Sequence, residues 1–117
     1  MPSNLVEMSC AATPSSVAPL KGAALKPWMD QVPGWSVVDE HHLKRAFSFP
    51  DFVTALAFVN RVGAIAEREQ HHPDILLGWG KAEITTFTHS IQGLSKNDFI
   101  LAAKINAQAP APPVSGS

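Results

Sequence analysis

The chain has 117 residues and a formal net charge of −1, and 45% of its residues are hydrophobic while 16% are charged. The length indicates one domain, and the composition is typical of a folded globular protein and excludes an intrinsically disordered one. With so little net charge, there is no electrostatic basis for direct nucleic-acid binding.

The sequence predicts a cytoplasmic protein. Residues 1–20 lack the basic start and the continuous apolar run of a secretory signal, and no apolar run approaches the roughly 20 residues that a membrane span needs. Cys10 is the single cysteine, so it cannot form an internal disulfide, which favours a reducing compartment. We therefore expect a cytoplasmic location, no membrane segment and a chemically inert Cys10.

Both ends of the chain lack the patterns of a packed domain. Residues 1–19 are rich in Ser, Ala and Pro with little periodicity, which predicts a flexible N-terminal arm. Residues 109–117 form a Pro/Ser/Gly tail that cannot build a core and is expected to be disordered. The sequence therefore predicts one folded domain over residues 20–108.

The first part of this domain is expected to hold a short helix and a β-hairpin. Pro27 limits any helix within residues 20–32 to one or two turns, because proline in a helix interior costs about 3 kcal/mol. Strands are predicted at residues 35–39 and 43–49, joined by a hairpin connection. The second strand alternates, which places on one face Leu43, Arg45, Phe47 and Phe49.

The strongest helical pattern covers residues 50–69. Pro50 suits the first turn of a helix, and the carboxylate of Asp51 complements the positive end of the helix dipole. Apolar residues recur at helical spacing and predict one buried stripe, made of Phe52, Ala55, Phe58, Val59, Val62, Ile65 and Ala66.

The last part of the domain is predicted to be a second hairpin followed by a helix. Strands are expected at residues 74–79 and 82–88. The second of them alternates, which places on one face Ala82, Ile84, Thr86 and Thr88. Ser95 followed by Asp98 is a variant of the capping box, so a helix is expected over residues 99–107 with Asp98 as part of its cap.

This order of elements, α-β-β-α-β-β-α, defines the expected fold class. Strands joined by tight hairpins pair antiparallel, and helices that cover one face of the sheet form a second layer. We therefore expect an α+β two-layer sandwich with a four-stranded antiparallel sheet and the helices packed on one face. The uncovered sheet face or edge favours oligomerisation.

Three histidines are the candidate chemical groups. His71 and His72 are adjacent at the end of the long helix and are followed by Pro73, and His89 follows the alternating strand where it ends. Element ends at a sheet rim are common places for sites, and histidine transfers protons near neutral pH. The competing interpretation is structural: a polar helix end, with His71 favoured by the helix dipole, and a solvated histidine at a strand end.

The same regions also allow other interpretations. Three histidines with a water can hold zinc, but adjacent histidines in an extended stretch point in opposite directions, so no metal is expected. Glu67, four residues before His71, can hold a histidine tautomer or be a surface acid. Trp79 can stack on a flat heterocycle or anchor the core or an interface. The pair His41-His42 lies in the predicted hairpin connection and is expected to have no chemical role.

A set of motifs distributed over about residues 20–106 matches a known pattern. The motifs of the first half are Gly34-Trp35, Leu43-x-Arg45-x-Phe47-x-Phe49-x-x-Phe52 and Ala57-Phe58-Val59-Asn60-Arg61-Val62. Those of the second half are Glu67-x-x-x-His71-His72-Pro73, Trp79, Lys81, Ile84, Thr88-His89, Gly93-Leu94-Ser95 and Asp98. Together these motifs resemble the pterin-4a-carbinolamine dehydratase family, which implies the α+β fold already expected from periodicity.

The resemblance implies a hydro-lyase, a 4a-hydroxytetrahydrobiopterin dehydratase that forms quinonoid dihydropterin and so recycles the cofactor of aromatic amino-acid hydroxylases. It implies no metal or organic cofactor for the dehydratase itself, and assembly as a homodimer or homotetramer. The catalytic set it implies is His71, His72 and His89, with His71 and His89 transferring protons and His72 positioning the pterin. The substrate-binding positions it implies are Glu67, Gln70, Pro73, Trp79 and Thr88.

The chain departs from the family pattern in places that bear on rate and substrate preference. Gln70 stands where the family often has an acid, and a neutral amide can hydrogen-bond a pterin but cannot raise the pKa of a histidine as a carboxylate does. Ile75 stands where some relatives have an aromatic residue, and Asn97 where some have a basic one.

The resemblance also leaves a second function open. Some members of the family are non-catalytic scaffolds, either a RuBisCO assembly factor or a transcriptional coactivator that binds a homeodomain factor. The three histidines are all present in this chain, which favours the enzyme. Fold-level analogy alone does not separate the two functions.

Overall fold

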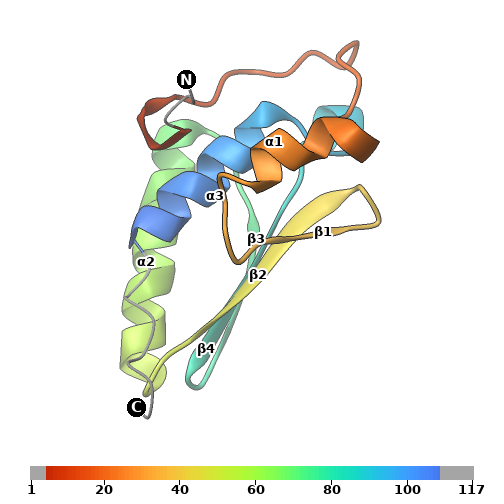
Figure 1. Cartoon of the computed structure of the whole chain (residues 1–117). Coiled ribbons are helices and arrows are strands. Elements are labelled where there is room, and N and C mark those ends of the chain that lie inside the picture. Colours follow the sequence, from red (N-terminus) through yellow and green to blue (C-terminus); the bar gives the residue numbers. More distant parts are fainter. Residues whose placement is uncertain (1–4, 109–117) are drawn as a thin grey trace.

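The computed structural model describes residues 5–108 and has an α+β fold (Figure 1). Its strands are β1 (Ser36–Val38), β2 (His42–Ser48), β3 (Asp74–Gly78) and β4 (Lys81–Thr86). Its helices are α1 (Lys26–Met29), α2 (Phe52–Glu69) and α3 (Lys96–Gln108), with 3-10 helices η1 (Leu5–Glu7), η2 (Gly22–Leu25) and η3 (His89–Ile91). The predicted order α-β-β-α-β-β-α is confirmed, and the predicted tail at 109–117 lies outside the described residues.

The strands form one antiparallel sheet in the order β1-β2-β4-β3. Figure 1 shows α1, α2 and α3 together on one side of this sheet, so the expected two-layer sandwich is confirmed. Asp74 at the start of β3 lies opposite Thr85 near the end of β4. The end of α2 and the end of β4 therefore meet at the same end of the sheet.

The alternating residues of β2 and β4 supply the sheet's share of the core. Leu43 and Phe47 from β2 and Ile84 from β4 are buried, as the alternation predicts. Arg45 shares this face of β2 but is only half-buried. Its guanidinium carbon lies 4.4 Å from the centroid of the Phe47 ring, and its Nη1 donates to Oδ1 of Asn106 over 2.7 Å. The charge thus sits at the core's edge with polar and aromatic partners.

Helix α2 has side-chain and backbone caps at its two ends. The hydroxyl and backbone N–H of Thr54 donate to the carboxylate of Asp51, which holds the pKa of Asp51 below its usual range. The predicted stripe is buried at Ala55, Phe58, Val62, Ile65 and Ala66. Phe52, the first residue of the helix, remains 43% exposed, so the stripe begins later than predicted. The helix ends at Gln70, whose left-handed backbone (φ 56°) directs the chain toward β3.

Helix α3 begins with the predicted capping box. The backbone N–H of Ser95 donates to Oδ2 of Asp98 over 3.0 Å, and the N–H of Asn97 donates to the Ser95 hydroxyl over 3.2 Å. The helix packs against α2, and its buried residues include Phe99, Ile100, Leu101, Ala102, Ala103 and Ile105. The cap therefore fixes Asp98 at the buried start of a core helix.

The segment predicted to be a flexible arm lies along the helical layer. Leu5 is buried in the core, and the carbonyl of Val6 accepts a hydrogen bond from Lys104 Nζ in α3 over 2.7 Å. Further along, the N–H of Leu20 donates to the carbonyl of Leu94 over 2.8 Å. Figure 1 shows this segment running past the start of α3 before it reaches α1. Its flexibility stays a prediction, as do the domain boundaries at residues 20 and 108.

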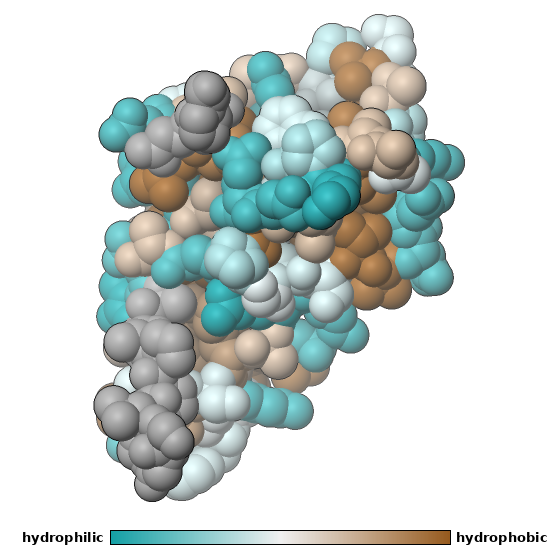
Figure 2. Space-filling view, viewed as in Figure 1, coloured by the Kyte–Doolittle hydropathy of each residue, from teal (hydrophilic) through white to brown (hydrophobic). Residues whose placement is uncertain are grey.

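The surface is mixed in character. The face that carries α1 and α3 has separate hydrophobic areas between hydrophilic ones (Figure 2). Large apolar side chains that are exposed include Val53 of α2, Leu76 of β3 and Trp79. Within residues 5–108, no helix combines the length and apolar content needed to cross a bilayer. The homodimer or homotetramer stays a prediction.

Candidate active site

A pocket of about 440 Å³ lies where α2 ends, where β4 ends and where α3 begins. This volume falls within the roughly 300–1,000 Å³ of small-molecule sites. The residues that line it are Ala11, Ala12, Thr13, Gln70, His71, His72, Phe87, Thr88, His89, Ser90 and Asn97. The structure therefore brings His89 to the same pocket as the adjacent pair His71 and His72.

The buried partner of His71 is Asp98. Nε2 of His71 lies 2.7 Å from Oδ1 of Asp98, and the aspartate side chain has no solvent exposure while that of His71 is 12% exposed. The hydroxyls of Thr86 and Thr88 each donate to Asp98 over 2.8 Å, in addition to the N–H of Ser95. A carboxylate surrounded by donors in this way is an acceptor only. The hydrogen-bond geometry therefore assigns the Nε2 proton of His71 to the bond with Asp98, and Nδ1 is the ring nitrogen that this carboxylate does not contact.

Local sequence explains this arrangement. Thr86 is the last residue of β4 and Thr88 lies two residues beyond it, so the strand ends earlier than predicted, but both hydroxyls bond the carboxylate in the first turn of α3, on the face that the alternation predicts. The Thr88 hydroxyl gives its proton to Asp98, so the Ser95 hydroxyl, 2.7 Å away, is the donor of the bond between Ser95 and Thr88. Within residues 5–108, no buried side-chain nitrogen or oxygen lacks a hydrogen-bond partner. The side chains of Asp98, Thr86, Thr88, Ser95 and His71 thus form one hydrogen-bonded network.

His72 has a different partner and a wetter setting. Its Nε2 lies 2.6 Å from Oε2 of Glu67, and both side chains are exposed. Glu67 lies one helical turn before His71, yet it pairs with His72, because the left-handed Gln70 ends the helix and turns the next residues out of helical phase. In water such a pair contributes little stability, so its effect is to orient the His72 ring.

His89 is positioned by aromatic rings. It is exposed at the start of η3, and its ring centroid lies 4.2 Å from that of Phe87. Phe87 also contacts His41, which lies in the hairpin connection between β1 and β2, and the two ring centroids are 4.4 Å apart. His41 and His42 do not line the pocket, and His41 is linked to His89 through Phe87.

The remaining substrate-binding predictions divide between the pocket and other places. Gln70 and Thr88 line the pocket. Glu67 and Pro73 do not, although Glu67 reaches it through His72. Trp79 is 74% exposed in the turn between β3 and β4, at the opposite end of that hairpin from the histidines. It does not line this pocket, and its predicted role in substrate binding stays a prediction.

Several residues of the site were missed by sequence reasoning. Asp98 was predicted only as a helix cap, and the signal for more was the pair of threonines on the buried face of the strand. Asn97 and Ala11–Thr13 also line the pocket; the family pattern marks Asn97 as a departure, whereas nothing in the sequence links Ala11–Thr13 to the pocket. Within the described residues, no group of three or more His, Cys, Asp or Glu side chains could hold a metal ion.

The site can now be compared with known proteins. The family model described as pterin 4 alpha carbinolamine dehydratase matches residues 18–108. A Rubrobacter xylanophilus protein that is provisionally named pterin-4-alpha-carbinolamine dehydratase is 56% identical over 104 residues, covering 89% of this chain and 97% of that protein. A protein of the same provisional name from Alkaliphilus metalliredigens is 45% identical over 106 residues, covering 90% of this chain and 96% of that protein.

Solved structures agree in fold. The crystal structure of a transcriptional coactivator/pterin dehydratase from Brucella melitensis is similar with a TM-score of 0.74 and 31% identity, covering 79% of this chain and 99% of that one. A pterin dehydratase-like protein identified as a RuBisCO assembly factor in the α-carboxysome has a TM-score of 0.59 at 23% identity, covering 70% of this chain and 96% of that one, which supports the fold alone. By its matched residues and its relatives, this chain belongs to the pterin 4 alpha carbinolamine dehydratase family.

Proposed function

We propose that the chain is a 4a-hydroxytetrahydrobiopterin dehydratase, a hydro-lyase that converts the pterin 4a-carbinolamine to quinonoid dihydropterin and water. The observation that carries the proposal is the convergence of His71, His72 and His89 on one pocket, with Nε2 of His71 bound to the buried Asp98. Membership of the dehydratase family supports the same reaction. The protein is expected to act in the cytoplasm as a homodimer or homotetramer, without a metal or organic cofactor.

The chemistry needs two proton transfers. The hydroxyl on C4a takes up a proton and leaves as water, and N5 gives up its proton as the double bond between C4a and N5 forms. Both electrons of the broken C–O bond leave with the water, and the N–H pair becomes the new π bond, so no oxidant or reductant is required. Positioned acid–base groups typically contribute about 10²–10⁴-fold to such a step.

Asp98 suits His71 to this role. With Nε2–H donated to the carboxylate, Nδ1 of His71 is free to accept or return a proton. When Nδ1 is protonated, the adjacent carboxylate stabilises the imidazolium, which is the role of the aspartate in a hydrolase triad. Phe87 holds the His89 ring at the pocket as a second proton-transfer group. His72, oriented by Glu67, is proposed to position the pterin.

A non-catalytic function is the second candidate. The relative from Brucella melitensis is named a transcriptional coactivator as well as a pterin dehydratase, and a protein of similar fold is named a RuBisCO assembly factor. On this alternative the fold would bind a protein partner, and the pocket would be a remnant. The complete histidine set and its buried carboxylate favour the enzyme.

Stopped-flow absorbance with chemically generated 4a-hydroxytetrahydropterin tests the proposal. The wild-type chain should accelerate dehydration, and His71→Ala should lose at least about 100-fold of the rate. His42→Ala is the matched control, because His42 lies outside the pocket and should keep its rate within about twofold. A folded wild-type protein that gives no acceleration would move the assignment to the scaffold, and a pull-down of its partner would follow.

A further inference from the structure

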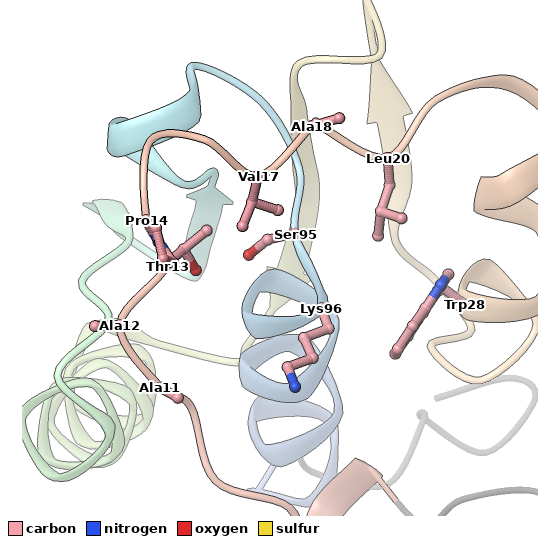
Figure 3. Close-up of a pocket in the computed structure, with 10 residues that line it drawn as sticks. All are labelled: Ala11, Ala12, Thr13, Pro14, Val17, Ala18, Leu20, Trp28, Ser95 and Lys96. Carbon is pink, nitrogen blue, oxygen red and sulfur yellow. The ribbon is translucent and has the colours of Figure 1, made fainter.

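Residues Ala11–Thr13 separate two hollows. On one side they line the histidine pocket, and on the other they line a second hollow of about 440 Å³. The other residues of that second hollow are Pro14, Val17, Ala18, Leu20, Trp28, Ser95 and Lys96. Figure 3 shows the segment looping past the start of α3, with Val17, Leu20 and Trp28 around the hollow beyond it. The wall between the two spaces is therefore a single stretch of backbone.

Polar contacts to Asn97 hold this wall. The N–H of Ala11 donates to Oδ1 of Asn97 over 3.1 Å, and Nδ2 of Asn97 donates to the Ala11 carbonyl and, over 3.0 Å, to the Thr13 hydroxyl. The Ser90 hydroxyl donates to the Thr13 carbonyl over 2.7 Å. Asn97 is only 3% exposed, whereas Ala11 and Ala12 are exposed. Apolar burial at these alanines is small, so hydrogen bonds set the wall's position.

A second set of contacts anchors the residues just before the wall. The N–H of Cys10 donates to Oε1 of the buried Glu69 over 2.9 Å. Nζ of Lys104 lies 3.6 Å from Oε2 of Glu69 and donates to the carbonyl of Val6. These anchors lie outside the pocket and join the arm to α2 and α3. They keep the wall in reach of Asn97.

We propose that Ala11–Thr13 form a specificity-determining wall of the pterin pocket and that Asn97 is the residue that positions it. This inference rests on the proposed function, in which the histidines face the bicyclic ring where the chemistry occurs. The wall has small side chains at Ala11 and Ala12, which leaves room for a substituent on the pterin ring. Its position, and not the histidines, sets how long a C6 side chain the pocket accepts.

The first test enlarges the wall at Ala12. Ala12→Phe is compared with Ala18→Phe, the same substitution at an exposed alanine of the same segment that lines only the second hollow. The probes are 7,8-dihydrobiopterin, with a three-carbon C6 side chain, and 6-methyl-7,8-dihydropterin, with Kd measured by fluorescence titration. We expect Ala12→Phe to raise the Kd of the long probe about tenfold and that of the short probe less than about threefold. Ala18→Phe should change neither.

The second test examines Asn97. If Asn97 acts by holding the wall, Asn97→Ala should release Ala11–Thr13 from their place beside the pocket. The larger side chain introduced by Ala12→Phe would then no longer narrow the pocket. We expect the tenfold effect of Ala12→Phe to fall below about threefold in the Asn97→Ala background, a non-additivity that independent sites do not produce. A purely structural role of Asn97 would weaken both probes equally and leave the ratio of their Kd values unchanged. Additive effects on that ratio would remove Asn97 from the inference.

The outcomes separate this inference from the proposed function. Equal Kd changes for Ala12→Phe and Ala18→Phe, with both variants folded by far-UV CD, would overturn the wall. Ala12→Val provides a smaller change if Ala12→Phe does not fold, with Ala18→Val as its control. A wild-type chain that binds both pterins without dehydrating the carbinolamine refutes the proposed function. In that case, the ratio of the Kd values of the two probes still tests whether Ala11–Thr13 form the wall. A wild-type chain that binds neither pterin overturns both.

Discussion

Nε2 of His71 and Oδ1 of Asp98 lie 2.7 Å apart, although His71 follows the end of α2 and Asp98 lies in the first turn of α3, 27 residues later in the chain. The carboxylate thus serves the protein in two ways. Oδ2 caps α3 through Ser95, while Oδ1 binds the histidine. Folding of the helix start and orientation of the candidate catalytic ring therefore depend on one side chain.

Asp98→Asn should lower both the stability of the protein and its dehydration rate. An amide in place of the carboxylate cannot accept at both atoms, so we expect destabilisation of about 1–3 kcal/mol from mismatched buried donors. The dehydration rate should fall by at least about 100-fold, because the His71 imidazolium loses its charged partner. Urea unfolding and stopped-flow absorbance give the two values. Asp74→Asn, at an exposed position of β3, is the control, and a rate for Asp98→Asn within threefold of wild type would contradict the network's role.

Glu67→Gln should act on binding more than on chemistry. The Glu67–His72 pair is exposed, so its loss should leave stability nearly unchanged, while the His72 ring loses its orientation. We expect KM for the carbinolamine to rise about three- to tenfold with kcat within about threefold, as for a group that binds substrate and transition state alike. Glu83→Gln, whose carboxylate faces Lys44 on the sheet, is the matched control. A loss confined to kcat would assign Glu67 to proton transfer instead.

The Cys10 thiol should react slowly with alkylating reagents in the folded chain. Burial first, and then the negative charges of Glu69 and Asp98, raise the pKa of Cys10 from 9.0 to about 12. Only the thiolate reacts with iodoacetamide, so at pH 8 alkylation of the folded protein should be about a thousandfold slower than in urea. Mass spectrometry of quenched samples measures both rates. Equal rates would mean that the arm is not held against Glu69 in solution.

A fall in pH should weaken the contact between Cys10 and Glu69. Burial acts to raise the pKa of Glu69, but the Cys10 N–H, Lys104 and Arg68 outweigh it and hold the pKa below the usual 4.5. A carboxylate whose folded-state pKa is depressed contributes stability above its unfolded pKa and loses it as the pH falls through the folded value. Wild type should therefore exceed Glu69→Gln in urea stability at pH 6.5, with the gap narrowing below pH 4.5. A gap that is constant across this range would contradict the assignment.

The fold was predictable because its signals are local. Alternation in the two hairpins and the helical spacing of Phe58, Val62 and Ile65 depend only on near neighbours in the chain, and they fix which face of each element is apolar. The capping box of α3 is also local, and the structure bears it out. Phe52 is the exception, since its place in the stripe depends on how far the sheet extends beneath the start of α2.

The candidate site was predictable only in part, for the opposite reason. The histidines were found because their residue type and the family pattern mark them. The Asp98 partner required knowing that β4 and α3 face each other, and the exposure of Trp79 follows from its place at a hairpin tip. Asn97 and Ala11–Thr13 meet across more than 80 residues of chain through bonds from one side chain to the backbone of Ala11 and the hydroxyl of Thr13, which leave no periodic trace in a sequence.

The pocket's wall begins before the region by which the family is identified. The family match starts at residue 18, whereas Ala11–Thr13 line the pocket ahead of it. With the proposed wall, a substitution at Ala12 changes the opening of the pocket while the three histidines and Asp98 stay in place. The groups proposed for the reaction and the residues proposed for the choice of substrate thus lie on separate stretches of the chain.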